Sequence, residues 1–180
     1  MQCMPTLSAA AQGNASCRSL AGTTDAFFRD RRPDLVILSG DWLEYARPPR
    51  FDGMIADIKQ TIAQLNTSGI PVVLLGPAVQ FRSRLPSMLM RAQLRRIDPL
   101  PRDFILPDVF ALDQMMRAAL PAHEKFSYVS VLDTVCPLRQ CPLTTDGGIP
   151  LAWDHAHLTA EGSVYVMDKL VPMLGVGRKL

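Results

Sequence analysis

The chain has 180 residues, of which 48% are hydrophobic, and its 19 Lys and Arg against 17 Asp and Glu leave a formal net charge of +2. This length suits one domain with a buried core, and the composition excludes wholesale disorder. The longest apolar run, residues 70–79, is too short and too rich in proline for a membrane span. We also expect no signal peptide in these residues, because the first of them lack a basic region and an apolar core.

Strands and helices are predicted to alternate along the chain. Short apolar runs rich in β-branched residues predict buried strands at 35–39, 71–76 and 128–132. Apolar spacing predicts helices at 52–65, 88–96, 108–120 and 159–174, the last with Thr159 as its N-cap. This alternation predicts an α/β fold with a doubly wound parallel sheet flanked by helices.

Arg91, Arg95 and Arg96 lie at helical spacing in a stretch without interleaved aromatic residues. We interpret them as a solvated helix face rather than a nucleic-acid interface, so nucleic acid is not an expected partner.

The four cysteines form two local pairs, Cys3 with Cys17 and Cys136 with Cys141. Two disulfides would suit an oxidising compartment, and four unpaired thiols are the alternative. A four-cysteine zinc site is disfavoured because neither pair has the short spacing of zinc ligands. We expect neither a metal centre nor a cofactor.

Asp154 stands three residues before His157, just ahead of the predicted last helix. A carboxylate beside an imidazole fixes its tautomer and stabilises the imidazolium, as the base of a serine-type esterase or acyltransferase requires. The alternative is a capping Asp and a loop His without a catalytic role. We interpret His155 and His123 as surface residues, and Ser163 as a helix-packing residue.

The block Asp154-x-x-His157-Leu-Thr-x-x-Gly-Ser resembles the last sequence block of the SGNH (GDSL-like) hydrolases. Other features resemble, more narrowly, the SGNH domain attached to membrane O-acyltransferases of the acyltransferase 3 family. They are Cys-x-Pro from Cys3, Cys17, the Arg-Pro-Asp-Leu-Val-Ile-Leu strand at 32–38, Trp42 at its end, and the loop from Cys136 to Cys141.

The resemblance implies a single three-layer, flavodoxin-like domain over residues 1–180, with His157 as the general base and Asp154 as its orienting carboxylate. It implies acyl transfer or ester hydrolysis through an acyl-serine, on acyl esters of surface glycans such as O-acetylated polysaccharide. Such domains are periplasmic or otherwise extracytoplasmic and joined to a membrane acyltransferase domain, a compartment that suits paired cysteines.

The Gly-Asp-Ser block that carries the family's nucleophile is missing from the sequence. In Ser39-Gly40-Asp41-Trp42, Gly40 matches a family glycine, and Trp42 takes the place of an Asn that donates to the oxyanion hole. Trp42 could donate its indole N–H there, or could be a packed aromatic cap.

We therefore expect an N-terminally truncated domain that lacks its first strand and its serine. The strand at 35–39 would have an unpaired edge, and the fragment alone would be inactive. Two alternatives remain: a catalytically inactive accessory domain that binds glycan or a partner, and a cytosolic α/β binding protein in which the Asp-His pair is coincidental.

Overall fold

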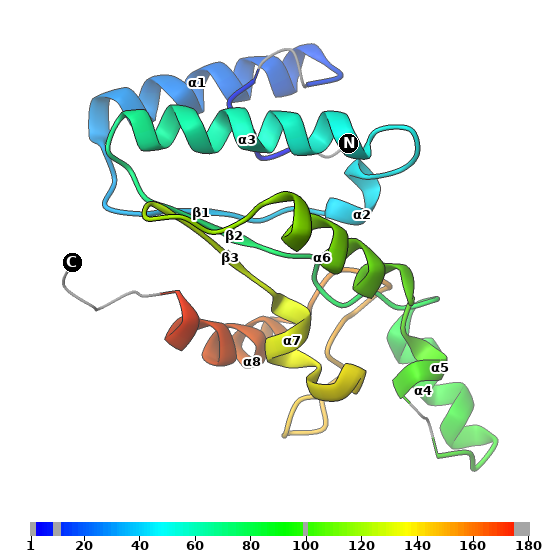
Figure 1. The fold of residues 1–180 in the computed structure, drawn as a ribbon. Helices are drawn as coiled ribbons and strands as arrows, with labels where there is room; N and C mark the ends of the chain where they lie inside the picture. The colour runs from blue at the N-terminus through cyan, green and yellow to red at the C-terminus, as the bar shows by residue number, and fades with distance from the viewer. Residues whose placement is uncertain (1–2, 9–11, 99–100, 175–180) are drawn as a thin grey trace. The chain divides into compact units, whose positions relative to one another are not determined.

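The computed structural model describes residues 3–8, 12–98 and 101–174, which form two compact units (Figure 1). The first unit comprises residues 1–76 and 112–129, and the second comprises residues 77–111 and 130–180. Each unit is described by itself.

A parallel sheet with the strand order β1-β2-β3 lies in the first unit. Its strands are β1 (Val36–Leu38), β2 (Val72–Leu75) and β3 (Phe126–Val129). The central strand β2 is buried along its whole length, as a strand with parallel neighbours on both sides should be. Within the described residues β1 pairs with β2 alone, so it forms an edge of the sheet. The α/β class with a parallel sheet is therefore confirmed.

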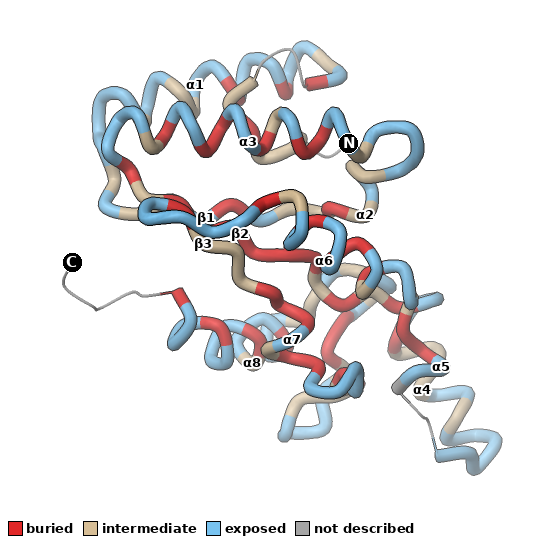
Figure 2. The backbone as a smooth tube through the Cα atoms, in the orientation of Figure 1, coloured by how far each residue is buried: buried red, intermediate tan, exposed pale blue. Residues whose placement is uncertain are grey.

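Helix α3 (Phe51–Thr67) lies over this sheet (Figure 1). Its buried positions follow the helical period, and Ile58, in the middle of that face, is fully buried. They pack with strand residues and with the C-terminal part of α6 (Asp108–Ala119) in one apolar core. Figure 2 shows the buried side of α3 turned toward the strands.

Two helices of the first unit were not predicted. α1 (Ala15–Arg31) buries only Cys17 and Ala21, so its sequence has little apolar periodicity to reveal it. The Asn14 side chain caps it by accepting from the Cys17 N–H, and the Cys3–Cys17 disulfide fastens the preceding segment to its first turn. α2 (Trp42–Tyr45) begins at Trp42, with Asp41 as its N-cap.

The second unit is mostly helical. It contains α4 (Leu85–Leu94), α5 (Pro101–Phe104), α7 (Val131–Val135), η2 (Pro137–Arg139), α8 (Ala160–Leu170) and η3 (Val171–Met173). The Cys136–Cys141 disulfide closes the loop around η2. No helix in the described ranges is long and apolar enough to cross a membrane.

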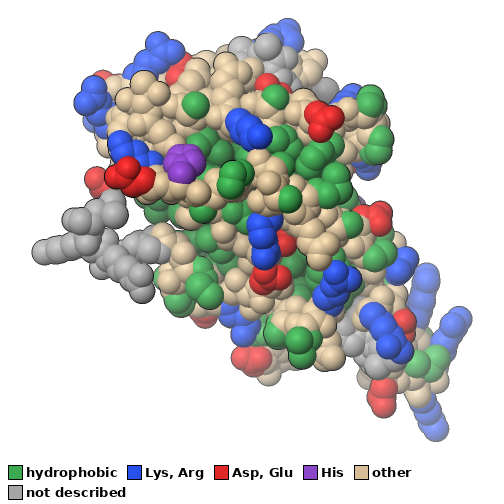
Figure 3. Space-filling view, in the orientation of Figure 1, with side chains coloured by type: hydrophobic (Ala, Val, Ile, Leu, Met, Phe, Trp, Pro, Cys, Tyr) green, Lys and Arg blue, Asp and Glu red, His purple; other side chains and the backbone are tan. Residues whose placement is uncertain are grey.

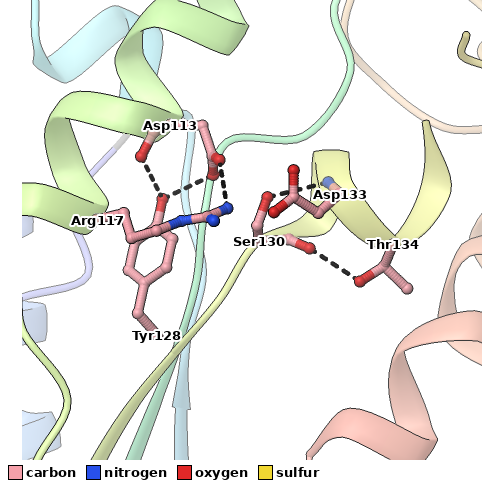
Figure 4. Close-up of polar contacts among 6 residues, drawn as sticks. All are labelled: Asp113, Arg117, Tyr128, Ser130, Asp133 and Thr134. Carbon is pink, nitrogen blue, oxygen red and sulfur yellow. Dashed lines mark hydrogen bonds and ion pairs between the residues drawn. The ribbon is translucent and has the colours of Figure 1, made fainter. Parts of the chain in front are cut away.

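The third strand was predicted two residues too late, because Ser130 starts a helix instead of continuing the strand. The Ser130 side chain accepts from the Asp133 N–H at 3.0 Å, which is an N-cap, and the Thr134 hydroxyl donates to the Ser130 carbonyl (Figure 4). Val131 and Leu132 extend the apolar run of the strand in sequence, but they are the first residues of α7.

A polar group around the buried Asp113 lies beside Gly76, the residue after β2. The Tyr128 hydroxyl donates to Asp113 Oδ1 at 2.8 Å, and Arg117 pairs with Asp113 Oδ2 at 3.1 Å (Figure 4). A Cβ on Gly76 would collide with the Tyr128 hydroxyl and with Asp113. The backbone therefore approaches these side chains as closely as only glycine allows.

We predict that Tyr128→Phe destabilises the protein by about 1–3 kcal/mol, because Asp113 loses a hydrogen bond in a site where only 3% of the residue is exposed. Tyr165→Phe is the matched control, since its ring contact with Lys169 does not use the hydroxyl. Denaturant unfolding measures both variants. Equal stability of Tyr128→Phe and the control would show that the hydrogen bond contributes nothing.

Candidate active site

Asp154 and His157 meet in a short loop of the second unit. The loop is closed by an isolated bridge between Ala152 and Leu158, and the Trp153 N–H donates to the His157 carbonyl at 3.0 Å. Asp154 Oδ2 lies 2.7 Å from His157 Nδ1, so the structure brings together the two residues that the sequence singles out.

The second oxygen of Asp154 holds the backbone of the same loop. Oδ1 accepts from the Ala156 N–H at 2.8 Å and from the His157 N–H at 2.7 Å. The spacing of three residues between Asp and His lets one carboxylate bind the backbone of the loop with one oxygen and the imidazole with the other.

This geometry assigns the imidazole tautomer, since an ionised carboxylate can only accept. His157 Nδ1 therefore carries a proton and donates it to Asp154, and in the neutral ring Nε2 keeps a lone pair. The His157 side chain is 55% exposed and that of Asp154 is 14% exposed. The imidazole is thus accessible to a group that gives it a proton at Nε2, while the Asp154 carboxylate remains bound to Nδ1.

Electrostatics favours the charged form of Asp154. Burial raises the pKa of this carboxyl, but hydrogen bonds from the His157 and Ala156 N–H groups and from the imidazole outweigh burial and lower the pKa from 3.8 to about 2. Asp154 is therefore an anion at neutral pH, as the partner of an imidazolium must be.

Backbone N–H groups at Phe81 and at the start of α4 bind the loop that carries Asp154 and His157. The Phe81 N–H donates to the His155 carbonyl at 2.8 Å, and the Leu85 N–H donates to the Asp154 carbonyl at 3.1 Å. Both side chains are almost fully buried, so the donors are fixed by packing. Backbone contacts of this kind have no sequence signature, so the contact between residues 81–85 and the pair was not predicted.

The Leu-Thr-x-x-Gly that follows His157 joins the loop to α8. The Thr159 hydroxyl accepts from the Gly162 N–H at 3.0 Å, as an N-cap does, and donates to the Pro150 carbonyl at 2.9 Å. A Cβ on Gly162 would collide with the Leu151 carbonyl oxygen. This part of the block therefore packs the start of α8 against the strand-like segment before the loop.

The exposed indole of Trp153 stacks on His157. The ring centroids are 5.5 Å apart with planes at 26°, and Trp153 is 59% exposed. Trp153 directly precedes Asp154 in the sequence, and we predicted no role for it. Of the other polar residues considered, His155, His123 and Ser163 are exposed. The described ranges contain no group of three or more His, Cys, Asp or Glu that could hold a metal ion.

Trp42 and Gly40 belong to the first unit. The Trp42 indole is 1% exposed, and its Nε1–H donates to the Leu75 carbonyl at 2.7 Å. Of the two interpretations of Trp42, this geometry fits the packed aromatic residue better than the oxyanion donor. A Cβ on Gly40 would lie 3.1 Å from Pro5 and 3.2 Å from Tyr45, so the backbone there is closely covered.

Both predicted cysteine pairs, Cys3–Cys17 and Cys136–Cys141, are disulfide-bonded. Each lies within one unit.

The low pKa of Asp154 makes stability depend on pH in acid. Because the folded pKa of about 2 is below the reference value of 3.8, this carboxylate contributes stability above pH 3.8, and the contribution is lost as pH falls through about 2. Wild type should therefore lose more unfolding free energy than Asp154→Asn between about pH 4 and 2. Denaturant unfolding at several pH values measures this, and an Asp154 carboxyl that titrates near 4 by NMR would contradict it.

Gly162→Ala should destabilise the protein, by an expected cost of about 1–3 kcal/mol for overpacking, because the new Cβ meets a backbone oxygen. Gly53→Ala is the control, since this glycine is also helical and has open space at its Cβ. It should stabilise by about 0.5–1 kcal/mol through helix propensity. Thermal unfolding compares the two, and equal shifts would mean that the close approach at Gly162 does not matter.

Comparison with known proteins identifies the family. A family model described as the SGNH domain fused to AT3 domains matches residues 1–172. The periplasmic domain of a lipopolysaccharide acetyltransferase from Salmonella ser. Paratyphi A has a similar structure, with a TM-score of 0.75 and 16% identity over 94% of this chain and 67% of that one. No curated protein matches the sequence. The chain belongs to the family of SGNH domains that are fused to AT3 domains.

Proposed function

We propose that this chain is the SGNH part of an O-acyltransferase or esterase that acts on acyl esters of surface glycans by a Ser-His-Asp mechanism. The observation that carries the proposal is the 2.7 Å contact between Asp154 Oδ2 and His157 Nδ1, which leaves Nε2 as the basic nitrogen. Membership of a family of SGNH domains fused to AT3 domains supports the acyltransferase class.

In this mechanism His157 Nε2 takes the proton of a serine hydroxyl while the serine oxygen attacks the acyl carbonyl carbon. The tetrahedral intermediate collapses when Nε2 returns the proton to the leaving alcohol, which leaves an acyl-serine. A sugar hydroxyl or water then gives its proton to Nε2, attacks the acyl-serine, and releases the serine with that proton. Asp154 stabilises the imidazolium in both halves.

The serine is assigned to a segment outside these 180 residues, since no serine here follows Gly-Asp. The oxyanion-hole role of Gly40 stays a prediction from the sequence. Trp42 would first have to release the Leu75 carbonyl, to which it donates its only N–H. We therefore give the Trp42 indole no direct part in the reaction.

We further propose an extracytoplasmic location and a membrane acyltransferase domain as partner. Two disulfides support an oxidising compartment, and the structurally similar Salmonella protein is a periplasmic domain. That protein is a lipopolysaccharide acetyltransferase, which supports an acyl group on a surface glycan as the substrate class.

One observation favours a second candidate, a glycan-binding accessory domain without catalysis. Trp153 presents an exposed indole beside His157, and an amphipathic aromatic face of this kind can pack against a sugar ring. In this case the same loop would bind glycan, and the Asp154–His157 pair would only shape the site.

Hydrolysis of an aryl acetate tests the catalytic proposal. The chain alone is compared with a version extended by a segment that supplies a Gly-Asp-Ser block. We expect activity only in the extended protein, and a fall of roughly 10⁶-fold in kcat for His157→Ala, the size of the loss when a triad histidine is removed. His155→Ala is the control, because it removes an exposed imidazole from the same loop.

Activity of the 180-residue chain itself that depends on His157 would contradict an outside nucleophile. An inactive extended protein that still binds acylated glycan, with affinity lost in Trp153→Ala, would favour the accessory domain.

A further inference from the structure

A strongly basic segment of the second unit has no part in the proposed chemistry. Residues 82–97, here named the arginine arm, contain five arginines and no acidic residue. The chain as a whole has a net charge of +2, so the remaining residues together carry −3. The net positive charge of the chain therefore comes from this segment, and Figure 3 shows Lys and Arg side chains over α4 and α5.

The arm also exposes apolar side chains at helical spacing. Met90 and Leu94 are 57% and 78% exposed, and their spacing of four residues places them on one face of α4. Ile97, just beyond the end of the helix, is 57% exposed. The opposite face of α4 carries Leu85, which is fully buried. A helix packed by one face on a protein normally turns polar residues outward, so an outward apolar row is unusual.

The backbone at the end of α4 holds Ile97 against the last turn of the helix. Arg96 adopts a left-handed conformation with φ 53°, which glycine usually occupies at this position. The chain turns back there, and the Ile97 N–H donates to the Ala92 carbonyl at 3.0 Å. The five arginines are exposed, and within the described ranges none of them is in an ion pair.

We propose that the arginine arm docks the domain on an anionic lipid surface. Arginines attract the anionic headgroups, and the apolar row enters the boundary between headgroups and acyl chains, as in helices that lie in a membrane interface. A second copy of this chain is a poorer occupant, because two arms of like charge repel each other. Single-stranded nucleic acid is also poorer, because residues 82–97 offer no aromatic ring for base stacking.

The segment that joins the arginine arm to the rest of the unit also contacts the candidate site. Phe81 bridges to Ile105, and the Arg82 N–H donates to the Phe104 carbonyl at 2.8 Å, so the arm leaves the unit through a paired neck. The Phe81 and Leu85 N–H groups at this neck are the ones that hold the loop of Asp154 and His157. An arm on a membrane would therefore hold that loop near the surface.

Co-sedimentation of the full chain with vesicles tests the proposal. Phosphatidylglycerol–phosphatidylcholine vesicles should bind the chain, more weakly at high salt, and phosphatidylcholine vesicles should not. The variant Arg91→Ala/Arg95→Ala/Arg96→Ala should bind about a hundredfold more weakly, from the attraction of three arginines. Arg29→Ala/Arg31→Ala/Arg47→Ala is the control with the same change of charge in the other unit, at side chains 71–73% exposed.

The variant Leu94→Gln/Ile97→Gln separates the apolar contribution from charge, and should bind roughly tenfold more weakly to the same vesicles. Both positions are exposed, and circular dichroism verifies the fold of every variant.

Three results would overturn the proposal. The first is that wild type binds both kinds of vesicle equally, or binds neither. The second is that the arm variant and the control lose the same amount of vesicle binding. The third is that the arm variants change the self-association of the chain without changing its binding to vesicles.

Discussion

The Asp154 carboxylate accepts three hydrogen bonds from its own loop, and the candidate site depends on them. Two come from backbone N–H groups and set the turn, while the third comes from the imidazole and sets its orientation. The same bonds lower the pKa of the carboxyl and keep it charged. The shape of the loop, the tautomer of the imidazole and the charge of the carboxyl therefore all follow from the hydrogen bonds of this one carboxylate.

The surrounding fold fixes this loop at both ends. Phe81 and Leu85 bind its carbonyls from the neck of the arginine arm, and Thr159 with Gly162 joins it to α8. The loop therefore has little freedom to move the imidazole away from the carboxylate. If the arm rests on a lipid surface, the base is presented near the membrane, where an acyltransferase domain embedded in that membrane could supply the acyl group.

Sequence reasoning predicted the parts that leave a local pattern. The strands β1 and β2, the helix α3 and the Asp-His pair all come from short-range periodicity or spacing. α1 was missed because only two of its residues are buried, and β3 was placed too late because α7 begins with apolar residues. The contacts of Phe81 and Leu85 with the loop could not be predicted, since any residue supplies a backbone N–H. Arg91, Arg95 and Arg96 were assigned to a solvated helix face. That Leu94 and Ile97 beside them are also exposed can be seen only in the structure, so the sequence did not indicate a lipid-binding surface.

The tautomer of His157 is the most direct test of the central claim that Asp154 prepares this imidazole as a base. Imidazole nitrogen NMR at neutral pH distinguishes the two ring nitrogens in the free, folded chain. We predict that Nδ1 of His157 is protonated and Nε2 is not, and that Asp154→Asn removes this preference, while His155 shows none in either protein. A proton found mainly on Nε2 of His157, or the same mixture at His155 and His157, would contradict the account.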